Sequence, residues 1–531
     1  MGDESASEPR SSTAALLVIV VLGLGLRLCG LLWGLPDSDQ RWSFHPDEYR
    51  IADAAARVVE ERTLHPTRFQ YGSLAVYLPA AAGAPLHALG LVEGARSWHL
   101  VARCVSLACS VATILLTWAL ARRLFGERGA LWAALALAVA PGAVLLSGYA
   151  TPDAPSALFV TLALWASLCA FDARRDGRDE RWIWLAAVAG GLAAAVKYGV
   201  GAVVLVPLAI EIFGPGERPL GARIGRAFGI GALSLAVFAL CMPAAFTNLE
   251  QFGRDLHYEL VLHPRAGHGD LFTDTGDGWS YHLTANLPYL LGWPLVAAVI
   301  VGGVVGVRRA GVRAWLPFGF ALVMFALLGT SEVRFMRYLT PILPALCVGV
   351  GALATTRAVP LAAIAVGYAL LLSGLQAQAL LGTDPRDALL ATAEAELDPG
   401  AAIGTAVVPT FFHPPFTPEN GGPGIAKRFR AELEAGASPW RFPPKTGLDA
   451  NELARRRLDA FVLSEHDWQD DVRLGSASTL GFLEALDQRF GRVVVHTGIA
   501  PAGRRMFDWG VRATPHDWLY PFLEQRLYLG R

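Results

Sequence analysis

The sequence predicts an α-helical polytopic membrane protein with a small α/β domain at its C-terminal end, and three observations lead to this fold class. The chain has 531 residues, of which 53% are hydrophobic and only 17% are charged, with a mean hydropathy of +0.39. Soluble domains carry about 25% charged residues. Apolar runs close to the roughly 20 residues that span a bilayer recur until about residue 380. From about Asp384 the composition becomes that of a soluble domain.

Net charge and cysteine placement exclude two other classes of protein. The net charge is −1, which gives no reason to expect nucleic acid as a partner. All six cysteines lie in apolar runs, so buried thiols are expected rather than a disulfide framework. The first apolar run is too long for a signal-peptide core and lacks a small-residue cleavage site, so it is interpreted as a retained first span.

Eleven apolar runs are interpreted as membrane spans. The run 199–213 is shorter than the usual spanning length and is the weakest of them. The other ten are 13–35, 98–121, 129–147, 152–171, 182–198, 221–245, 283–307, 314–330, 338–356 and 358–380.

The loops between these runs predict the orientation of the chain. The segments 36–97, 246–282 and the tail from Thr383 are long and mixed in charge. The other loops are short, and the positive-inside rule places those that are rich in arginine in the cytoplasm. The N-terminus is then cytoplasmic and the C-terminus outside. The arginines are Arg122, Arg123 and Arg128; Arg174, Arg175, Arg178 and Arg181; Arg218, Arg223 and Arg226; Arg308, Arg309 and Arg313.

Two segments of the first outer loop are expected to be helical without spanning. Pro46–Glu61 repeats small and β-branched apolar residues at helical spacing, which predicts an interfacial amphipathic helix. Leu74–Leu91 contains two prolines and would spoil the parity of the spans. It is interpreted as a surface-lying or re-entrant helix packed on protein.

Residues 1–383 are thus predicted to form the membrane domain and residues 384–531 an outer α/β domain. Helices are expected at Pro385–Leu397 and Leu480–Phe490, with a long loop at His413–Gly424. Strands are expected at 402–408, 460–464 and 492–496. The aromatic residues of the tail are expected to pack this domain onto the membrane surface; they are Trp509, Trp518, Tyr520, Phe522 and Tyr528.

Two acidic positions at the outer face are candidates for chemistry. Asp47 and Glu48 follow His45-Pro46 at the outer end of the first span, where they would open a helix. The alternative is that they only complement the helix dipole. Asp153 lies between two spans on the same face, and its alternative role is that of a helix N-cap.

Basic residues are expected at the same level of the membrane. Only three of the 45 basic residues are lysines, and Lys197 interrupts an apolar run. Arg103 begins the second span, and Arg334 and Arg337 precede the tenth. Charges beside hydrocarbon usually face a polar cavity or a partner. The four cations together indicate a site for an anion, although Arg334 and Arg337 are equally explained as interfacial arginines.

The outer loop 246–282 is rich in histidine. His257, Glu259 and His268 are substrate-contact candidates, together with His45 and Tyr71 of the first outer loop. A zinc site is an alternative, but the histidine spacing is irregular. The sequence does not decide whether a divalent metal is needed, and it specifies no other cofactor.

In this order, the motifs resemble those of the type C glycosyltransferases related to protein O-mannosyltransferases and bacterial aminoarabinose transferases. The resemblance covers roughly residues 15–380. It rests on Leu32–Pro36, His45–Glu48, Tyr71–Leu74, Ala102-Arg103, Ala121–Gly126, Tyr149–Pro155, Ala195–Gly199 and Arg337–Pro344.

The resemblance implies a sugar donor carried on a polyprenyl phosphate and a location in the bacterial plasma membrane. Asp47 would be the general base for an acceptor hydroxyl, with inversion at the sugar, and Glu48 and Asp153 would assist it. Arg103, Lys197, Arg334 and Arg337 would bind the donor phosphate. The acceptor is a glycan, a lipid or a protein. The alternative function is a transporter or flippase for a lipid-linked or anionic solute, which would place its ionisable groups near the midplane.

Overall fold

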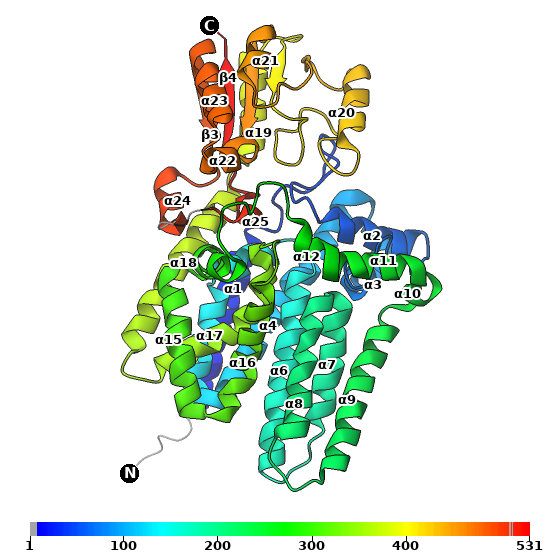
Figure 1. Ribbon diagram of the computed structural model, residues 1–531, viewed down its shortest axis with the longest axis vertical. Coiled ribbons are helices and arrows are strands. Elements are labelled where there is room, and N and C mark those ends of the chain that lie inside the picture. Colours follow the sequence, from blue (N-terminus) through cyan, green and yellow to red (C-terminus); the bar gives the residue numbers. More distant parts are fainter. Residues whose placement is uncertain (1–7, 509–510, 512, 531) are drawn as a thin grey trace.

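In the computed structural model, which describes residues 8–508, 511 and 513–530, a long helical bundle carries a smaller sheet-containing domain at one end (Figure 1). Six described helices are long and apolar enough to cross a membrane, and five shorter apolar helices accompany them. The predicted fold class, a polytopic helical protein with a small sheet domain, is confirmed.

Most helices of the bundle follow the predicted spans, but the span predicted at 283–307 is a continuous helix only from Trp293. The helices of the bundle are α1 (Glu8–Leu28), α4 (Gly94–Ala138), α6 (Asp153–Arg175), α7 (Trp182–Val196), η1 (Tyr198–Val204) with α8 (Leu205–Phe213), α9 (Leu220–Leu240), α15 (Trp293–Ala310), α16 (Val312–Leu328), η4 (Met336–Ile342) with α17 (Leu343–Ala354), and α18 (Val359–Leu381).

The predicted spans 98–121 and 129–147 differ from the structure in their boundaries. Helix α4 runs through both, broken only at Gly126, where φ is 71°. Its second half ends at Ala138, and α5 (Pro141–Ser147) follows as a separate helix. The break between α4 and α5 has a local cause. Pro141 is favourable as the first residue of a helix, but it holds the preceding Ala140 in an extended conformation.

Glycines let the backbones of the central helices approach closely. A Cβ atom on Gly302 of α15 would lie 2.0 Å from the carbonyl oxygen of Gly349 in α17. On the other side of α17, a Cβ atom on Gly351 would lie 2.4 Å from the carbonyl oxygen of Gly129 in α4. Small residues at such contacts are typical of helix packing in membranes. Helix α17 is therefore held between α4 and α15 at the core of the bundle.

A layer of shorter helices lies across the bundle on the side of the sheet domain (Figure 1). Helix α2 (Tyr49–Glu60) buries its apolar face, and α3 (Leu74–Ala88) packs beside it and on α4. Helix α2 begins only at Tyr49, so Asp47 and Glu48 precede the helix instead of opening it. The layer also contains α10 (Pro243–Thr247), α11 (Leu249–His257), the π-helical turn η2 (Tyr258–Leu262) and α12 (His263–Ala266). The segment before α15 forms α13 (Gly278–Tyr281), η3 (His282–Asn286) and α14 (Leu287–Leu291).

The C-terminal domain is built on a four-stranded sheet of order β1-β2-β4-β3. Strand β1 (Ile403–Thr405) is parallel to β2 (Ala460–Ser464), whereas β4 (Gln525–Leu529) is antiparallel to both β2 and β3 (Arg492–His496). Three strands were expected, and β4 was not. The helices of this domain are α19 (Pro385–Glu396), α20 (Ile425–Glu434), α21 (Ala450–Arg455), α22 (Glu465–Arg473), α23 (Ala477–Arg489), α24 (Pro501–Asp508) and α25 (His516–Leu519).

The tail aromatics do not pack on a membrane surface, contrary to the prediction. Trp518 is fully buried with its ring 4.8 Å from that of Tyr289 in α14, and Phe522 packs on Trp518. Tyr528 belongs to β4 and packs against Phe490. Trp518 thus joins the sheet domain to the helical bundle, whereas Tyr528 packs within the sheet domain. Trp509 lies outside the described residues.

Candidate functional site

A cavity of about 520 Å³ lies between the helical bundle and the C-terminal domain. Its lining residues come from helix ends, from loops and from the C-terminal domain. Seven of the twelve candidate residues line it: Asp47, Tyr71, Asp153, Lys197, Glu259, His268 and Arg337.

Asp47 forms one wall of the cavity together with two arginines. Its carboxylate lies 3.0 Å from Arg337 Nη2 and 3.5 Å from Arg50 Nε. Burial raises the pKa of Asp47, but the guanidinium groups of Arg337 and Arg50 outweigh it, so the pKa lies below its usual value. The other terminal nitrogen of Arg337, Nη1, is buried and has no hydrogen-bond partner among the described residues. The pair therefore keeps one donor available to a ligand.

Lys197 and Asp153 form a second charged pair in the lining of the cavity. Lys197 follows the last residue of α7 in an extended conformation, and its ammonium donates to Asp153 Oδ1 at 2.8 Å. The ammonium also lies 4.8 Å from the ring centroid of Tyr338. Asp153 is the first residue of α6 and makes no capping hydrogen bond, so the N-cap alternative is wrong. Its second oxygen, Oδ2, is buried without a partner.

The π-helical turn η2 brings a further acid to the cavity. Burial raises the pKa of Glu259, and the charges of Lys197 and Arg337 offset only part of that effect. Next to it, His263 Nε2 lies 3.0 Å from the hydroxyl of Tyr338, and the rings of His263 and His268 are 5.2 Å apart. Burial lowers the pKa of His263 to about 4, so this imidazole is neutral at pH 7.

Four side chains of the C-terminal domain close the cavity, and none of them was among the candidates. They are Phe412, His466, His516 and Tyr520. The rings of Phe412 and Tyr520 stack at 5.7 Å, and those of His466 and His516 lie 4.2 Å apart. Both ring nitrogens of His516 are buried without a partner, and burial holds its pKa well below the ordinary value. The domain thus contributes both ring faces and hydrogen-bonding groups.

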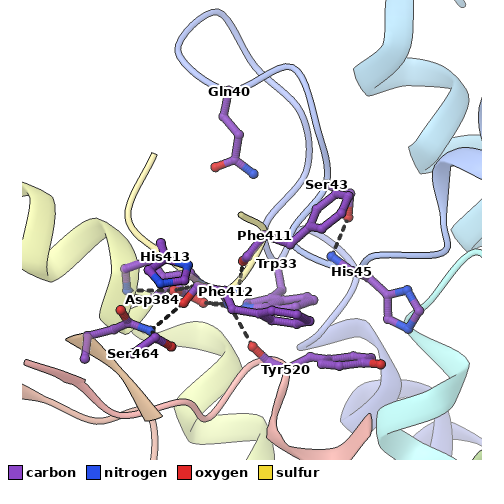
Figure 2. Close-up of polar contacts among 12 residues, drawn as sticks. Trp33, Gln40, Ser43, His45, Asp384, Phe411, Phe412, His413, Ser464 and Tyr520 are labelled. Atoms are coloured by element: carbon purple, nitrogen blue, oxygen red, sulfur yellow. Dashed lines mark hydrogen bonds and ion pairs between the residues drawn. The ribbon is translucent and has the colours of Figure 1, made fainter. Parts of the chain in front are cut away.

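These four residues form the roof of the cavity, and a buried ion pair fixes the roof to the turn that follows α1. The guanidinium of Arg386 donates to both oxygens of Asp384 at 2.7 Å each, and Trp33 Nε1 donates to the same carboxylate at 2.8 Å. Arg386 also donates to the carbonyl oxygens of Phe411 at 2.7 Å and Tyr520 at 2.8 Å. Figure 2 shows Trp33, Asp384, Phe411, Phe412 and Tyr520 gathered at this junction. Arg386 therefore holds two of the three chain segments that carry the roof rings, those of Phe412 and Tyr520.

Glu48 and Arg103 do not face the cavity, which corrects the roles expected of both. Their side chains are fully buried and make a bidentate pair, at 2.8 Å and 2.7 Å. Arg103 also donates to the carbonyl oxygens of Leu31 and Trp33. With its donors already used, Arg103 is not placed to bind a phosphate in the cavity. Glu48 is likewise not placed to act on a substrate.

Three other candidates also lie away from the cavity. Arg334 donates to Thr275 Oγ1 and to the carbonyl oxygen of Gly276, at 2.7 Å each, and stabilises the loop before α13. His257 lines a separate open groove. His45 is buried between the rings of Tyr149 and Tyr520. Its Nδ1 accepts a hydrogen bond from the Asp47 backbone, so His45 shapes the turn that presents Asp47.

Some lining residues were not candidates, and they differ in whether a nearby sequence motif could have indicated them. Arg50 and Gln70, hydrogen-bonded to each other at 2.7 Å, flank motifs that had been singled out. For the four residues of the roof, no local pattern marks the contact, because they lie more than 340 residues from Asp47. Among the described residues, no group of three or more His, Cys, Asp or Glu side chains is placed to hold a metal ion. The zinc alternative therefore lacks a ligand set there.

Comparisons with known proteins agree with this architecture. Residues 91–243 match the family described as dolichyl-phosphate-mannose-protein mannosyltransferase. The chain is similar to ArnT from Cupriavidus metallidurans in the apo state, with 16% identity and a TM-score of 0.50 over 87% of this chain and 95% of that chain. It is also similar to the apo oligosaccharyltransferase of Archaeoglobus fulgidus, with 14% identity and a TM-score of 0.47 over 93% of this chain and 74% of that chain. No curated protein matches the sequence. The chain has the type C glycosyltransferase fold, and the resemblance indicated by its motifs is confirmed.

Proposed function

We propose that this protein is a glycosyltransferase that moves a sugar from a polyprenyl phosphate to an acceptor hydroxyl, with inversion at the sugar. The observation that carries the proposal is the pair of acid–base couples that face one cavity, each with an unsatisfied polar atom: Arg337 Nη1 and Asp153 Oδ2. Buried polar atoms are nearly always hydrogen-bonded, so such atoms gathered around a cavity favour a polar ligand. The match of residues 91–243 to a family named for a dolichyl-phosphate sugar donor supports this donor class.

In the proposed reaction, Asp47 takes the proton of the acceptor hydroxyl as the hydroxyl oxygen attacks the anomeric carbon. The bond from that carbon to the phosphate oxygen breaks, and its electron pair remains on the phosphate. Arg337 and Lys197 stabilise the charge on the leaving phosphate. When Arg337 turns toward the phosphate, Asp47 loses its strongest charge partner and becomes a better base. Donor binding and base activation are then coupled through one guanidinium.

We place this reaction at the outer face of a bacterial plasma membrane, with residues 384–531 as an extracytoplasmic domain over the membrane domain 1–383. Helix α6 begins at Asp153 and ends at Arg175. At 1.5 Å per residue these ends are about 33 Å apart, close to the thickness of a bilayer. Arg123 and Arg313 bind Asp172 at that far end, where the arginine-rich loops gather. A reporter active only in the cytoplasm, fused to the C-terminus, should stay silent, and a strong signal would refute this orientation.

The test of the function is a donor assay. The purified protein, given a panel of polyprenyl-phosphate sugars, should consume at least one of them, by slow hydrolysis when no acceptor is added. The Asp47→Asn variant is the control for the active site. No consumption of any donor by folded wild-type protein would refute the proposal. The transporter alternative receives no support from the cavity, because its lining comes from helix ends and loops and not from the middle of a spanning helix.

A further inference from the structure

A second cavity, of about 260 Å³, adjoins the first behind a shared wall. Arg50, Arg68, Gln70 and Tyr71 line both cavities. We propose that this second cavity binds one sugar unit of the acceptor, so that the acceptor is a glycan. The identification of that sugar as part of the acceptor rests on the proposed transferase function.

One face of α2 forms the floor of the second cavity. Tyr49, Asp53 and Arg57 line it and are spaced by four residues, so they follow one another along the same side of the helix. The segment 66–71 forms the facing wall, and Trp42 and Pro423 complete the lining. Its volume lies just below the range of about 300–1,000 Å³ for sites of drug-sized ligands, which suits a ligand of one or two rings.

Aromatic rings give this cavity a surface suited to the C–H face of a pyranose. The rings of Trp42 and Tyr49 meet edge to face at 5.4 Å. Pro66, Ala54 and Val76 add apolar surface nearby. The axial C–H bonds of a sugar ring pack against such surfaces by dispersion, while its hydroxyls point outward around the ring. The two rings stand at 88° to each other and form an apolar corner, and a corner with polar groups at its rim fits a sugar ring better than a lipid chain.

The polar groups at the rim include the carboxylate of Asp53. Asp53 is partly buried and makes no hydrogen bond or ion pair with any described residue. Burial raises the pKa of Asp53, and the imidazole of His99 offsets only part of that effect. A carboxylate has only acceptor sites, so it is complemented by the hydroxyl groups of a sugar.

The charge balance of the second cavity favours a neutral ligand over an anion. Arg57 is paired with Glu61 at 3.1 Å, and Arg50 is held by Asp47 and Gln70. The one guanidinium of the lining without a described partner is that of Arg68, and the negative charge of Asp53 offsets it. A phosphate or sulfate placed here would face Asp53 and be repelled, whereas a polyhydroxylated ring meets both a donor and an acceptor.

The shared wall connects this site to the reacting groups. Arg50 contacts the carboxylate of Asp47 and also lines the second cavity. A sugar unit held beside Tyr49 and Asp53 is therefore adjacent to Asp47, so the next unit of the same glycan would present its hydroxyl to the base. A glycan acceptor spans both cavities, whereas a short aliphatic alcohol would not need the second.

The experiment measures sugar binding without any transfer. Full-length protein in detergent is titrated with methyl glycosides of a hexose, an N-acetylhexosamine, a deoxyhexose and a pentose, with saturation-transfer NMR as the readout. At least one glycoside should bind, and Asp53→Leu and Trp42→Ala should each weaken it at least tenfold. Asp53→Asn, which keeps the shape and one acceptor oxygen, should fall between, and it replaces Asp53→Leu if that variant fails to fold. Asp39→Leu, at an exposed acid of the same outer loop, is the matched control and should bind as wild type does.

Three outcomes decide the proposal. Binding that depends on Asp53 and Trp42 supports it. Binding to none of the glycosides, or binding that all variants retain, overturns it. Donor consumption is measured separately on the wild type: its absence would refute the transferase function, while variant-sensitive glycoside binding would still establish the sugar site.

Discussion

Two adjacent acids, Asp47 and Glu48, belong to two polar regions that differ in how completely the protein satisfies their hydrogen bonds. Behind the cavity wall, Glu48 accepts hydrogen bonds from Arg103 through both oxygens, and from the backbone of Ala150 at 2.7 Å. In the cavity, Asp47 also pairs with an arginine, but Arg337 keeps an unpartnered nitrogen there. Both regions contain a carboxylate and a guanidinium at close range. They differ in whether the protein itself satisfies every polar atom.

This difference separates an ion pair that stabilises the fold from one that faces a ligand. A buried pair with all its hydrogen bonds made leaves nothing for a substrate to complete, and removing one partner exposes an uncompensated charge. A pair with unmet atoms beside a cavity is complete only when something binds. The following predictions test this distinction, beginning with the largest expected effect.

Asp47→Asn should reduce the rate of sugar transfer by about 10²–10⁴-fold, which is the usual contribution of a general base. The amide cannot accept the acceptor's proton but keeps the size of the side chain, so the protein should remain folded. The measurement is kcat with the donor identified in the assay, together with thermal stability in detergent. Turnover close to that of wild type in a folded Asp47→Asn protein would remove Asp47 from the mechanism.

Arg103→Met should act on stability and not on the chemical step. Leaving Glu48 buried without its partner should cost about 3–5 kcal/mol of unfolding free energy. The expected observations are a lower melting temperature and a smaller folded fraction on size-exclusion chromatography, with kcat per folded molecule nearly unchanged. A stable variant that has lost donor binding would instead assign Arg103 to the phosphate site and contradict the comparison.

The sequence alone could not distinguish these two regions, although it predicted much of the molecule. Hydropathy located the spanning helices, since lipid imposes nearly continuous apolar runs on them. Arg103 and Lys197 look alike in sequence, as basic residues at the outer ends of apolar runs, and only tertiary contacts show that Arg103 is saturated and Lys197 lines the cavity.

The C-terminal contribution to the site was beyond local patterns for the same reason. Tyr520 and His516 reach the cavity because Arg386 and the buried ring of Trp518 fix their segment to the bundle. Strand β4 was not predicted, because it follows directly on a run of aromatic residues that was interpreted as a membrane-surface segment. Non-local pairing decides both cases, and a single sequence carries no direct record of it.

Lys197→Met should lower kcat/KM about ten- to a hundredfold, as expected for loss of one charge-assisted contact of about 1.5–3 kcal/mol. If the contact with the phosphate tightens as the phosphate leaves, the loss falls on kcat; if it is equal in both states, the loss falls on KM. Lys197→Arg is the informative second variant, because a planar guanidinium does not replace a compact ammonium in a confined site. Unchanged kcat/KM in folded Lys197→Met would leave Lys197 with a structural role only.

Arg386→Lys should raise KM about tenfold while leaving kcat largely intact. The lysine keeps the positive charge beside Asp384 but cannot hold the carbonyl oxygens of Phe411 and Tyr520 at the same time. The roof rings would then be less well positioned for substrate, although the reacting groups would be unaltered. Equal KM values in the two proteins would show that the roof does not depend on this junction.

The last prediction concerns the pH dependence of donor binding and the side chain of Glu259. Burial raises the pKa of Glu259 above the ordinary carboxyl value. As the pH falls through that raised pKa, Glu259 gains a proton and the cavity loses a negative charge near Lys197 and Arg337. An anionic donor should then bind more tightly, so its KM should fall as the pH is lowered from about 7.5 to about 5. Two unit charges about 10 Å apart interact by about 0.4 kcal/mol in the dielectric of water and by about 1.7 kcal/mol in the dielectric near a protein surface, which limits the change in KM to about two- to twentyfold.

Glu259→Gln makes this pH prediction specific, because the amide imitates the protonated acid at every pH. The variant should bind the donor as tightly at about pH 7.5 as the wild type does at about pH 5, with a KM that no longer depends on pH in this range. Asp47 should not contribute to the same change, since its lowered pKa keeps it ionised throughout. A wild-type KM that rises on acidification, or a pH dependence that persists in Glu259→Gln, would mean that another group controls donor binding. Lys197 and Arg337 would then bind the donor independently of Glu259.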